Sequence, residues 1–202
     1  MQNTHGTTRA QFLRRGATGG LALVAGGSLL ATTAGPALAA GSGGDPSDVD
    51  IAKLAATAEL LAVDFYTRCL DSGVFGGRRE RYLSGARDNE RDHYNALAKL
   101  IGADAPKDLT FQYPAGTFAS RENASRTGIA LETAFIGAYL GAIRALDDPN
   151  LKVVAGQIGA NEFGHYIVFT DILTGLPVGP SFPGPELSAG AAGAALAPFI
   201  AG

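Results

Sequence analysis

The sequence predicts an all-α protein in which residues 47–175 form a bundle of four long helices. Apolar residues recur with the helical period in four separate stretches of that segment. No strand-like alternation of useful length is found between them. One long connection divides the stretches into two pairs, as in a bundle whose chain crosses from one end to the other. With 202 residues, 46% of them hydrophobic and 17% charged, the chain is long enough for one domain with a real core.

The first 40 residues have the composition of an export signal. Arginines precede a stretch without charged residues over 16–44, in which Ala37-Leu38-Ala39 supplies the small-x-small pattern that signal peptidases accept. The stretch is rich in Gly, Ala and Thr, so it is weakly apolar for a membrane span, although an uncleaved anchor stays open. We expect cleavage near Ala39 and a polar linker over residues 41–46.

The segment from Thr8 to Arg14 is similar to the twin-arginine export signal of bacteria, whose consensus is Ser/Thr-Arg-Arg-x-Phe-Leu-Lys. Ala10 replaces the second arginine of that consensus, so the ordinary export route for unfolded chains stays open. With either route, we expect the mature protein in the periplasm, in the cell envelope or outside a bacterial cell.

Charge and cysteine content narrow the function classes. The formal net charge is -3 and the 16 Lys and Arg residues are scattered, so the sequence offers no basic face for nucleic acid or anionic lipid. We expect no nucleic-acid partner, and no membrane partner once the signal is removed.

Cys69 is the single cysteine, which excludes an intramolecular disulfide. It is either a small buried residue or a reactive thiol, including one that pairs between chains.

The first two stretches form the first helix pair. Ser47, followed three residues later by Asp50, is typical of a helix start, and apolar residues then recur with the helical period up to Gly73. A second helix is expected from about Arg78 to Ile101, with Gly102 at its end.

Residues 103–119 are predicted to form an extended crossover. Proline and glycine interrupt this segment, and its aromatic side chains would pin it to the bundle. Its length of about 17 residues allows the chain to run along the bundle before the next helix starts.

The second helix pair follows the crossover. A helix is expected from near Ser120 to Leu146, then a turn over residues 147–150, then a helix from about Leu151 to Thr174 that Gly175 and Pro177 close. The tail over 176–202 is rich in Pro, Gly and Ala, and predicts only a loop and a short helix after Glu186.

Each predicted helix carries one glutamate on its apolar side. Burying an ionised carboxylate without a partner costs several kcal/mol. Four such groups in one core would repel one another unless cations neutralise them. These residues are Glu59, Glu90, Glu132 and Glu162.

Two of these glutamates begin the same short motif. Glu90-Arg91-Asp92-His93 and Glu162-Phe163-Gly164-His165 each place a carboxylate and an imidazole on one face of a helix. A tyrosine follows each histidine, and another lies seven positions after each single glutamate, so the chain contains an internal repeat. These tyrosines either pack in the core or take part in electron transfer; they are Tyr66, Tyr94, Tyr139 and Tyr166.

This pattern resembles the ferritin-like di-iron and di-manganese carboxylate proteins, which take one Glu from each of two helices and Glu-x-x-His from each of the other two. The resemblance covers Asp50 to Gly175 and is particularly close to ferritin-like domain proteins that bacteria export. It implies a ferritin-like four-helix bundle in which Glu90 and Glu162 bridge two metal ions while Glu59 and Glu132 are terminal ligands. The implied metal ligands are Glu59, Glu90, His93, Glu132, Glu162 and His165.

The ligand types bear on the metal. Four carboxylates with two neutral imidazoles offset the charge of two divalent cations, so the site can be buried. Hard oxygen ligands with two nitrogens suit iron first and manganese second. Asp64 and Asp171 are either hydrogen-bonding supports for the ligands or solvated surface residues.

The expected function is that of an exported metalloprotein that uses dioxygen or peroxide, as a ferroxidase or a catalase-like oxidoreductase. The same bundle serves several chemistries, so the resemblance implies the site better than the substrate. The alternative is a non-enzymatic envelope or stress protein whose bundle binds metal for stability or holds none. Assembly into a homo-oligomer, including an iron-storage cage, stays open.

Overall fold

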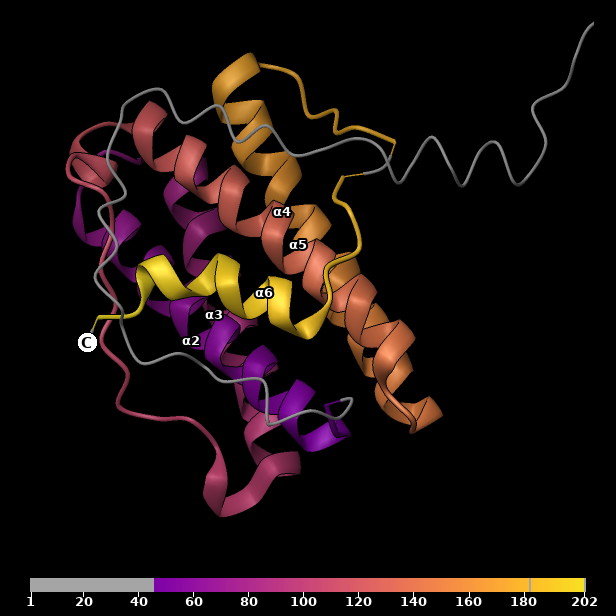
Figure 1. Cartoon of the computed structure of the whole chain (residues 1–202). Coiled ribbons are helices and arrows are strands. Elements are labelled where there is room, and N and C mark those ends of the chain that lie inside the picture. The colour runs from indigo at the N-terminus through magenta and orange to yellow at the C-terminus, as the bar shows by residue number, and fades with distance from the viewer. Residues whose placement is uncertain (1–45, 182, 202) are drawn as a thin grey trace, which may run out of the picture. The chain divides into compact units, whose positions relative to one another are not determined.

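A computed structural model describes residues 46–181 and 183–201, and the long elements of this part of the chain are all helices (Figure 1). The expected export signal and residues 41–45 of the expected linker lie outside the described residues. The prediction of an all-α bundle built from two helix pairs is confirmed. The four long helices are α2 (Asp48–Asp71), α3 (Arg78–Ile101), α4 (Arg121–Ala145) and α5 (Pro149–Thr174).

Local capping sets where the helices begin. At the start of α2, the Ser47 hydroxyl accepts from the Asp50 N–H at 3.2 Å and the Asp50 carboxylate accepts from the Ser47 N–H at 3.1 Å. This reciprocal capping box satisfies two backbone donors. Helix α5 begins at Pro149 rather than the expected Leu151, because Asp148 caps it and proline fits the first helical position.

The crossover between α3 and α4 is held by aromatic packing, as expected. The ring centroids of Tyr113 and Phe118 lie 5.9 and 5.8 Å from that of Phe65 on α2. Arg68 lies over the Tyr113 ring and donates to the carbonyl of Phe111 at 3.1 Å. The crossover also contains two short 3-10 turns, Gly102–Asp104 and Thr117–Ala119.

Two apolar clusters fill the bundle, one toward each end. One cluster contains Phe65, Leu83 and Phe169, and the other contains Leu97 and Ile158. Along α3 and α5 the inward glutamates, Glu90 and Glu162, fall between the residues of the two clusters. These two carboxylates are therefore enclosed by apolar layers on two sides.

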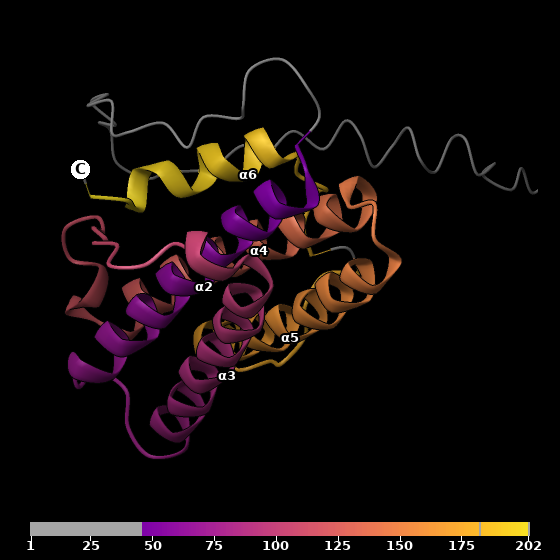
Figure 2. The same cartoon turned by 90° about the horizontal axis from the view of Figure 1, so that it is seen from below.

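The C-terminal tail forms a shorter helix, α6 (Ala189–Leu196), which lies across α2 and α4 on the outside of the bundle (Figures 1 and 2). The N–H of Leu187 donates to the carbonyl of Gly137 at 2.9 Å, and Arg144 pairs with Glu186 at 2.5 Å. Beyond α6, Phe111 and Ile200 form an antiparallel bridge between the crossover and the tail. The sequence predicted the short helix but not its docking.

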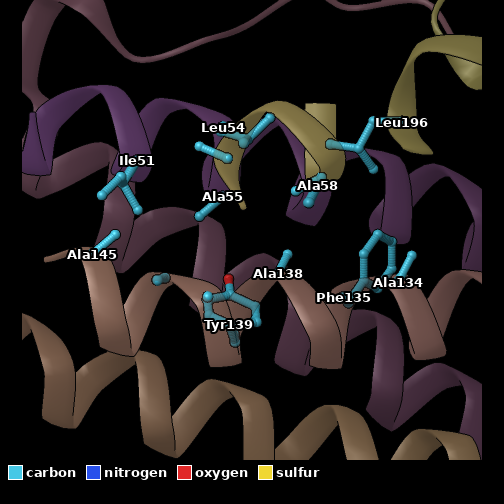
Figure 3. A pocket seen from close by; sticks show the side chains of 14 residues that line it. Ile51, Leu54, Ala55, Ala58, Ala134, Phe135, Ala138, Tyr139, Ala145 and Leu196 are labelled. Atoms are coloured by element: carbon cyan, nitrogen blue, oxygen red, sulfur yellow. The ribbon is translucent and has the colours of Figure 1, made fainter. Parts of the chain in front are cut away.

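A small cavity of about 40 Å³ lies beneath α6, between α2 and α4. Its walls are alanines and other apolar side chains, with the Tyr139 ring on the side away from α6 (Figure 3). An apolar cavity of this kind stays dry. The tail therefore completes the cover over this side of the core.

Replacing Gly141 with alanine is expected to loosen the tail. A Cβ there would lie 1.7 Å from the carbonyl oxygen of Leu187. Because that oxygen belongs to the backbone, the tail segment around Leu187 must move. We expect the free energy of unfolding to fall by about 1–3 kcal/mol, as for other overpacked sites. Chemical unfolding measures the change, and proteolysis of the tail should become faster.

Gly85→Ala is the matched control for that change. Gly85 lies in the middle part of α3 on its solvent-exposed side, and a Cβ there would meet no atom within 4 Å. Alanine should therefore stabilise the protein by about 0.5–1 kcal/mol. Equal effects of the two variants would contradict the docking of the tail on α4.

Helix α4 is the one described helix with the length and mean hydropathy to cross a membrane, and 44% of its most apolar window is buried inside the protein. It packs against α5, α2 and α6. A buried core helix has this composition as well, and Glu132 near its middle faces the other helices of the bundle.

Cys69 is fully buried on α2. Burial disfavours the thiolate and raises the pKa of the thiol. Both observations agree with the first of the two alternatives, a small buried residue on a helix.

Candidate metal centre

The structure brings all six predicted site residues together in the middle of the bundle. Each long helix contributes its inward glutamate, and α3 and α5 add their histidines one turn further on. Five of the six side chains are buried, whereas His93 is 16% exposed. His93 therefore marks the side from which solvent reaches the site.

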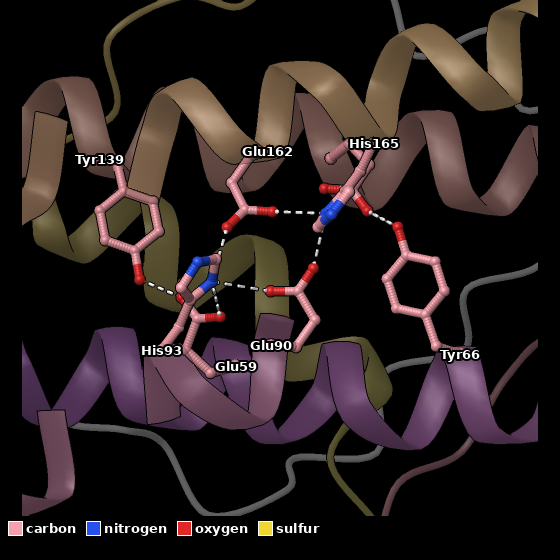
Figure 4. A network of polar contacts seen from close by, with 8 residues as sticks. Glu59, Tyr66, Glu90, His93, Tyr139, Glu162 and His165 are labelled. Atoms are coloured by element: carbon pink, nitrogen blue, oxygen red, sulfur yellow. Dashed lines mark hydrogen bonds and ion pairs between the residues drawn. The ribbon is translucent and has the colours of Figure 1, made fainter. Parts of the chain in front are cut away.

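The two histidines contact carboxylates from neighbouring helices (Figure 4). His93 Nδ1 lies 3.1 Å from a Glu90 oxygen and 3.3 Å from oxygens of both Glu59 and Glu162. His165 Nδ1 lies 2.7 Å from a Glu90 oxygen and 3.3 Å from a Glu162 oxygen. Each Glu-x-x-His motif thus contacts the other, which requires α3 and α5 to run antiparallel.

The nitrogen and oxygen atoms fall into two groups that share two residues. Within each group, one potential ligand atom per residue lies within 4.8 Å of all the others. Glu90 and Glu162 belong to both groups. The groups are Glu59, Glu90, His93 and Glu162, and Glu90, Glu132, Glu162 and His165.

Two tyrosines connect the single glutamates across α2 and α4. Tyr66 on α2 donates its hydroxyl to Glu132 on α4 at 2.5 Å, and Tyr139 on α4 donates to Glu59 on α2. The sequence placed each tyrosine near the glutamate of its own helix. In the structure each one contacts the glutamate of the other helix, because α2 and α4 are antiparallel and the phenol ring spans the gap.

Buried polar atoms without a hydrogen bond concentrate in this site. Among the described residues, seven buried side-chain N and O atoms have no hydrogen-bond partner, and five of them belong to the candidate ligands. Both oxygens of Glu162 are in this set. Four of the five atoms lie 2.7–3.3 Å from an oppositely charged candidate ligand, as ion pairs without hydrogen-bond geometry. Buried polar atoms are normally hydrogen-bonded, so this concentration favours a set of metal ligands. The donor set fits two hard divalent cations.

The electrostatics of the histidines reflect the carboxylates around them. Burial alone would lower their pKa values, but the contacts with carboxylates outweigh it. His93, facing Glu162, Glu59 and Glu90, has its pKa raised to about 12. His165, facing Glu162 and Glu90, has its pKa raised to about 11. The protein without metal therefore holds protons where cations would bind.

The carboxylates divide into two kinds. Burial raises the pKa of Glu59 and of Glu132 well above the usual range. For Glu90 burial acts in the same direction, but the contacts with His165 and His93 prevail and lower the pKa to about 2. A divalent cation entering this site must displace protons, so metal binding and proton release are linked.

Several residues near the site have other roles. Asp64 pairs with Arg68 at 2.8 Å at the surface of α2, which agrees with the solvated alternative. Tyr94 donates to the carbonyl of Pro106 at 2.8 Å, and Tyr166 stacks on a neighbouring phenylalanine, so both pack as structural side chains. Tyr82, which no sequence signal marked, packs edge-on against His165 with ring centroids 6.1 Å apart.

The fold and the site together define a class of protein: a helical bundle in which four glutamates and two histidines are arranged so that two metal ions can be held. A family model described as ferritin-like domain matches residues 47–175, and the chain belongs to this family. A search of curated proteins finds no match.

Proposed function

We propose that the six residues hold two metal ions, iron first and manganese second, and that the centre serves a ferroxidase or a peroxide- or dioxygen-consuming oxidoreductase. The observation that carries this proposal is the sharing of Glu90 and Glu162 between the two ligand groups. Shared carboxylates would hold two cations side by side, and such a pair would supply electrons to dioxygen or peroxide. Membership of the ferritin-like family supports the two-metal site.

When bound, a pair of Fe(II) ions supplies the two electrons that, with two protons, reduce one hydrogen peroxide to two water molecules. The protein's own residues arrange this chemistry. Glu90 and Glu162 span both positions, while Tyr66 and Tyr139 fix the carboxylates of Glu132 and Glu59 through hydrogen bonds. The apolar clusters on either side exclude bulk water from the core.

Metal content and turnover test the proposal. The chain is produced in medium supplemented with iron and manganese, and bound metal is measured after purification. Oxygen uptake and peroxide loss are then followed after Fe(II) is added under anaerobic conditions and the oxidant is mixed in. We expect about two metals per chain, as in related carboxylate bundles, with faster loss of oxidant than in the Glu90→Ala, Glu162→Ala double variant.

The outcomes separate the proposal from its alternatives. Fewer than about 0.2 metals per chain in the parent would contradict the two-metal site. Tight binding of metal without loss of dioxygen or peroxide would instead identify a metal-stabilised envelope or stress protein.

Removing either tyrosine hydroxyl is expected to weaken metal binding. Tyr66→Phe leaves the Glu132 carboxylate, and Tyr139→Phe the Glu59 carboxylate, without the hydrogen bond that orients it. Loss of such an outer contact typically lowers affinity about 10- to 100-fold. Titration with Mn(II) measures it. Tyr166→Phe is the control, since that ring stacks on Phe163 and contacts neither Glu59 nor Glu132 in the described contacts, and a loss equal to the other two would contradict the assigned role.

The proposal also includes export. Its support is the composition of residues 1–40 alone, with the signal sequence expected there. Fractionation of the native bacterium would test it, and recovery of the full-length protein from the cytoplasm alone would contradict it.

A further inference from the structure

A cavity of about 420 Å³ opens at one end of the bundle, where α2 and α5 begin and α3 and α4 end. This volume lies in the range of small-molecule sites, roughly 300–1,000 Å³. It is distinct from the small cavity beneath α6, although the two share part of a wall that includes Ile51 and Ala55. The end of the bundle is therefore hollow where a packed core would be expected.

The lining is apolar apart from two side chains. Alanine, leucine, isoleucine and valine from all four long helices form the walls, and the exceptions are Tyr139 and Lys99. Leu100 contributes to the wall while remaining 47% exposed. An apolar mouth left in water is a feature of surfaces that bind apolar ligands.

Lys99 is the one charged residue among those that line the cavity. Within residues 46–181 and 183–201, Lys99 takes part in no ion pair. Its aliphatic stem can lie along an apolar ligand while the ammonium stays at the water boundary.

Three carboxylates at the same end of the bundle are engaged elsewhere. Asp48 accepts two backbone N–H groups just before α5, Asp50 closes the capping box of α2, and Asp104 pairs with Lys53. None of them lines the cavity. A ligand entering there would thus meet an apolar interior with one cation at the wall.

The Tyr139 ring brings the cavity next to the candidate metal centre. It lines the cavity, and its hydroxyl donates to Glu59. A molecule that fills the cavity would lie one side chain away from a candidate ligand.

We propose that this cavity binds a single aliphatic chain with a terminal carboxylate, that is, a medium-chain fatty acid, with its tail against Tyr139 and its carboxylate beside Lys99. The apolar walls match the chain, since each buried methylene adds to affinity. The unpaired ammonium matches the head group. This site does not depend on bound metal.

Calorimetric titration of the full chain with octanoate tests the inference, with octanol and octylammonium as head-group comparisons. One octanoate should bind per chain, octanol about threefold to fivefold more weakly, and octylammonium more weakly still, as expected for one exposed ion pair. Lys99→Glu should weaken octanoate about tenfold and leave octanol within about twofold. Lys152→Glu, on α5 at the same end but outside the wall, is the matched control and should change little.

Ala155→Phe fills the cavity from α5 and should abolish binding of all three compounds, with thermal unfolding used to check the fold. Lys99 is exposed, so Lys99→Glu should fold normally. It therefore still tests the site if Ala155→Phe fails to fold. Absence of saturable octanoate binding would overturn the site. Equal effects of Lys99→Glu and Lys152→Glu would overturn the head-group contact. The titration is run on chelator-treated and on Mn(II)-loaded protein, so a negative result leaves the proposed metal function standing.

Discussion

Glu162→Gln is expected to remove both metal ions, whereas Glu59→Gln should leave one. Glu162 belongs to both ligand groups, and its two buried oxygens lie 3.3 Å from different histidines, one from His93 and the other from His165. Glu59 belongs to one group only. Bound metal should therefore fall from about two per chain to below about 0.2 for Glu162→Gln, and to about one for Glu59→Gln, because ligands must be complete for tight binding. Elemental analysis after dialysis measures both.

The fold must survive for this comparison to be meaningful. Glutamine has nearly the shape of glutamate, so helical content and unfolding cooperativity should match those of the parent. Glu122→Gln is the control, since Glu122 pairs with Arg126 at the surface, away from the site. If Glu162→Gln and Glu59→Gln each lost a single metal, Glu162 would not bridge.

Metal loading is expected to raise the melting temperature strongly. The protein without metal keeps carboxylates and charged histidines in an apolar core, and cations bind the folded arrangement of ligands. At about 100 times the dissociation constant, each site adds about 2.7 kcal/mol to the free energy of unfolding. For a domain of this size two sites should raise the melting temperature by about 10–20 °C.

Differential scanning calorimetry with Mn(II), after treatment with a chelator, measures the shift. Glu162→Gln should show almost none of it, which separates binding at the centre from weak binding to surface carboxylates. If neither Mn(II) nor Fe(II) changed the melting temperature of the parent protein, the proposed centre would be contradicted.

Much of the fold follows from short-range sequence signals. Ser47 with Asp50, Gly102, Ser120 and Gly175 each act within one helical turn, so helix starts and ends could be predicted to within about two residues. The inward glutamates were also predictable, because helical spacing alone places them among apolar side chains. Local rules therefore account for the four helices and for the glutamates and histidines that the structure brings together.

Contacts between distant segments could not be predicted in the same way. The hydrogen bonds from the tyrosine of each of α2 and α4 to the glutamate of the other helix depend on the direction and register of two helices that are far apart in the sequence. Docking of the tail depends on glycines of α4 that let the Leu187 backbone approach. The end cavity depends on how completely side chains fill space, which a pattern of apolar residues does not encode.

The hydrogen bonds from Tyr66 to Glu132 and from Tyr139 to Glu59 join the two halves of the chain at the candidate metal centre. Each half depends on the other for a hydrogen-bond donor. Tyr66 of the first half donates to Glu132 of the second half, and Tyr139 of the second half donates to Glu59 of the first half. Sliding one half along the other would break both links at once. The same bonds that orient the carboxylates therefore also fix the register in which the halves assemble.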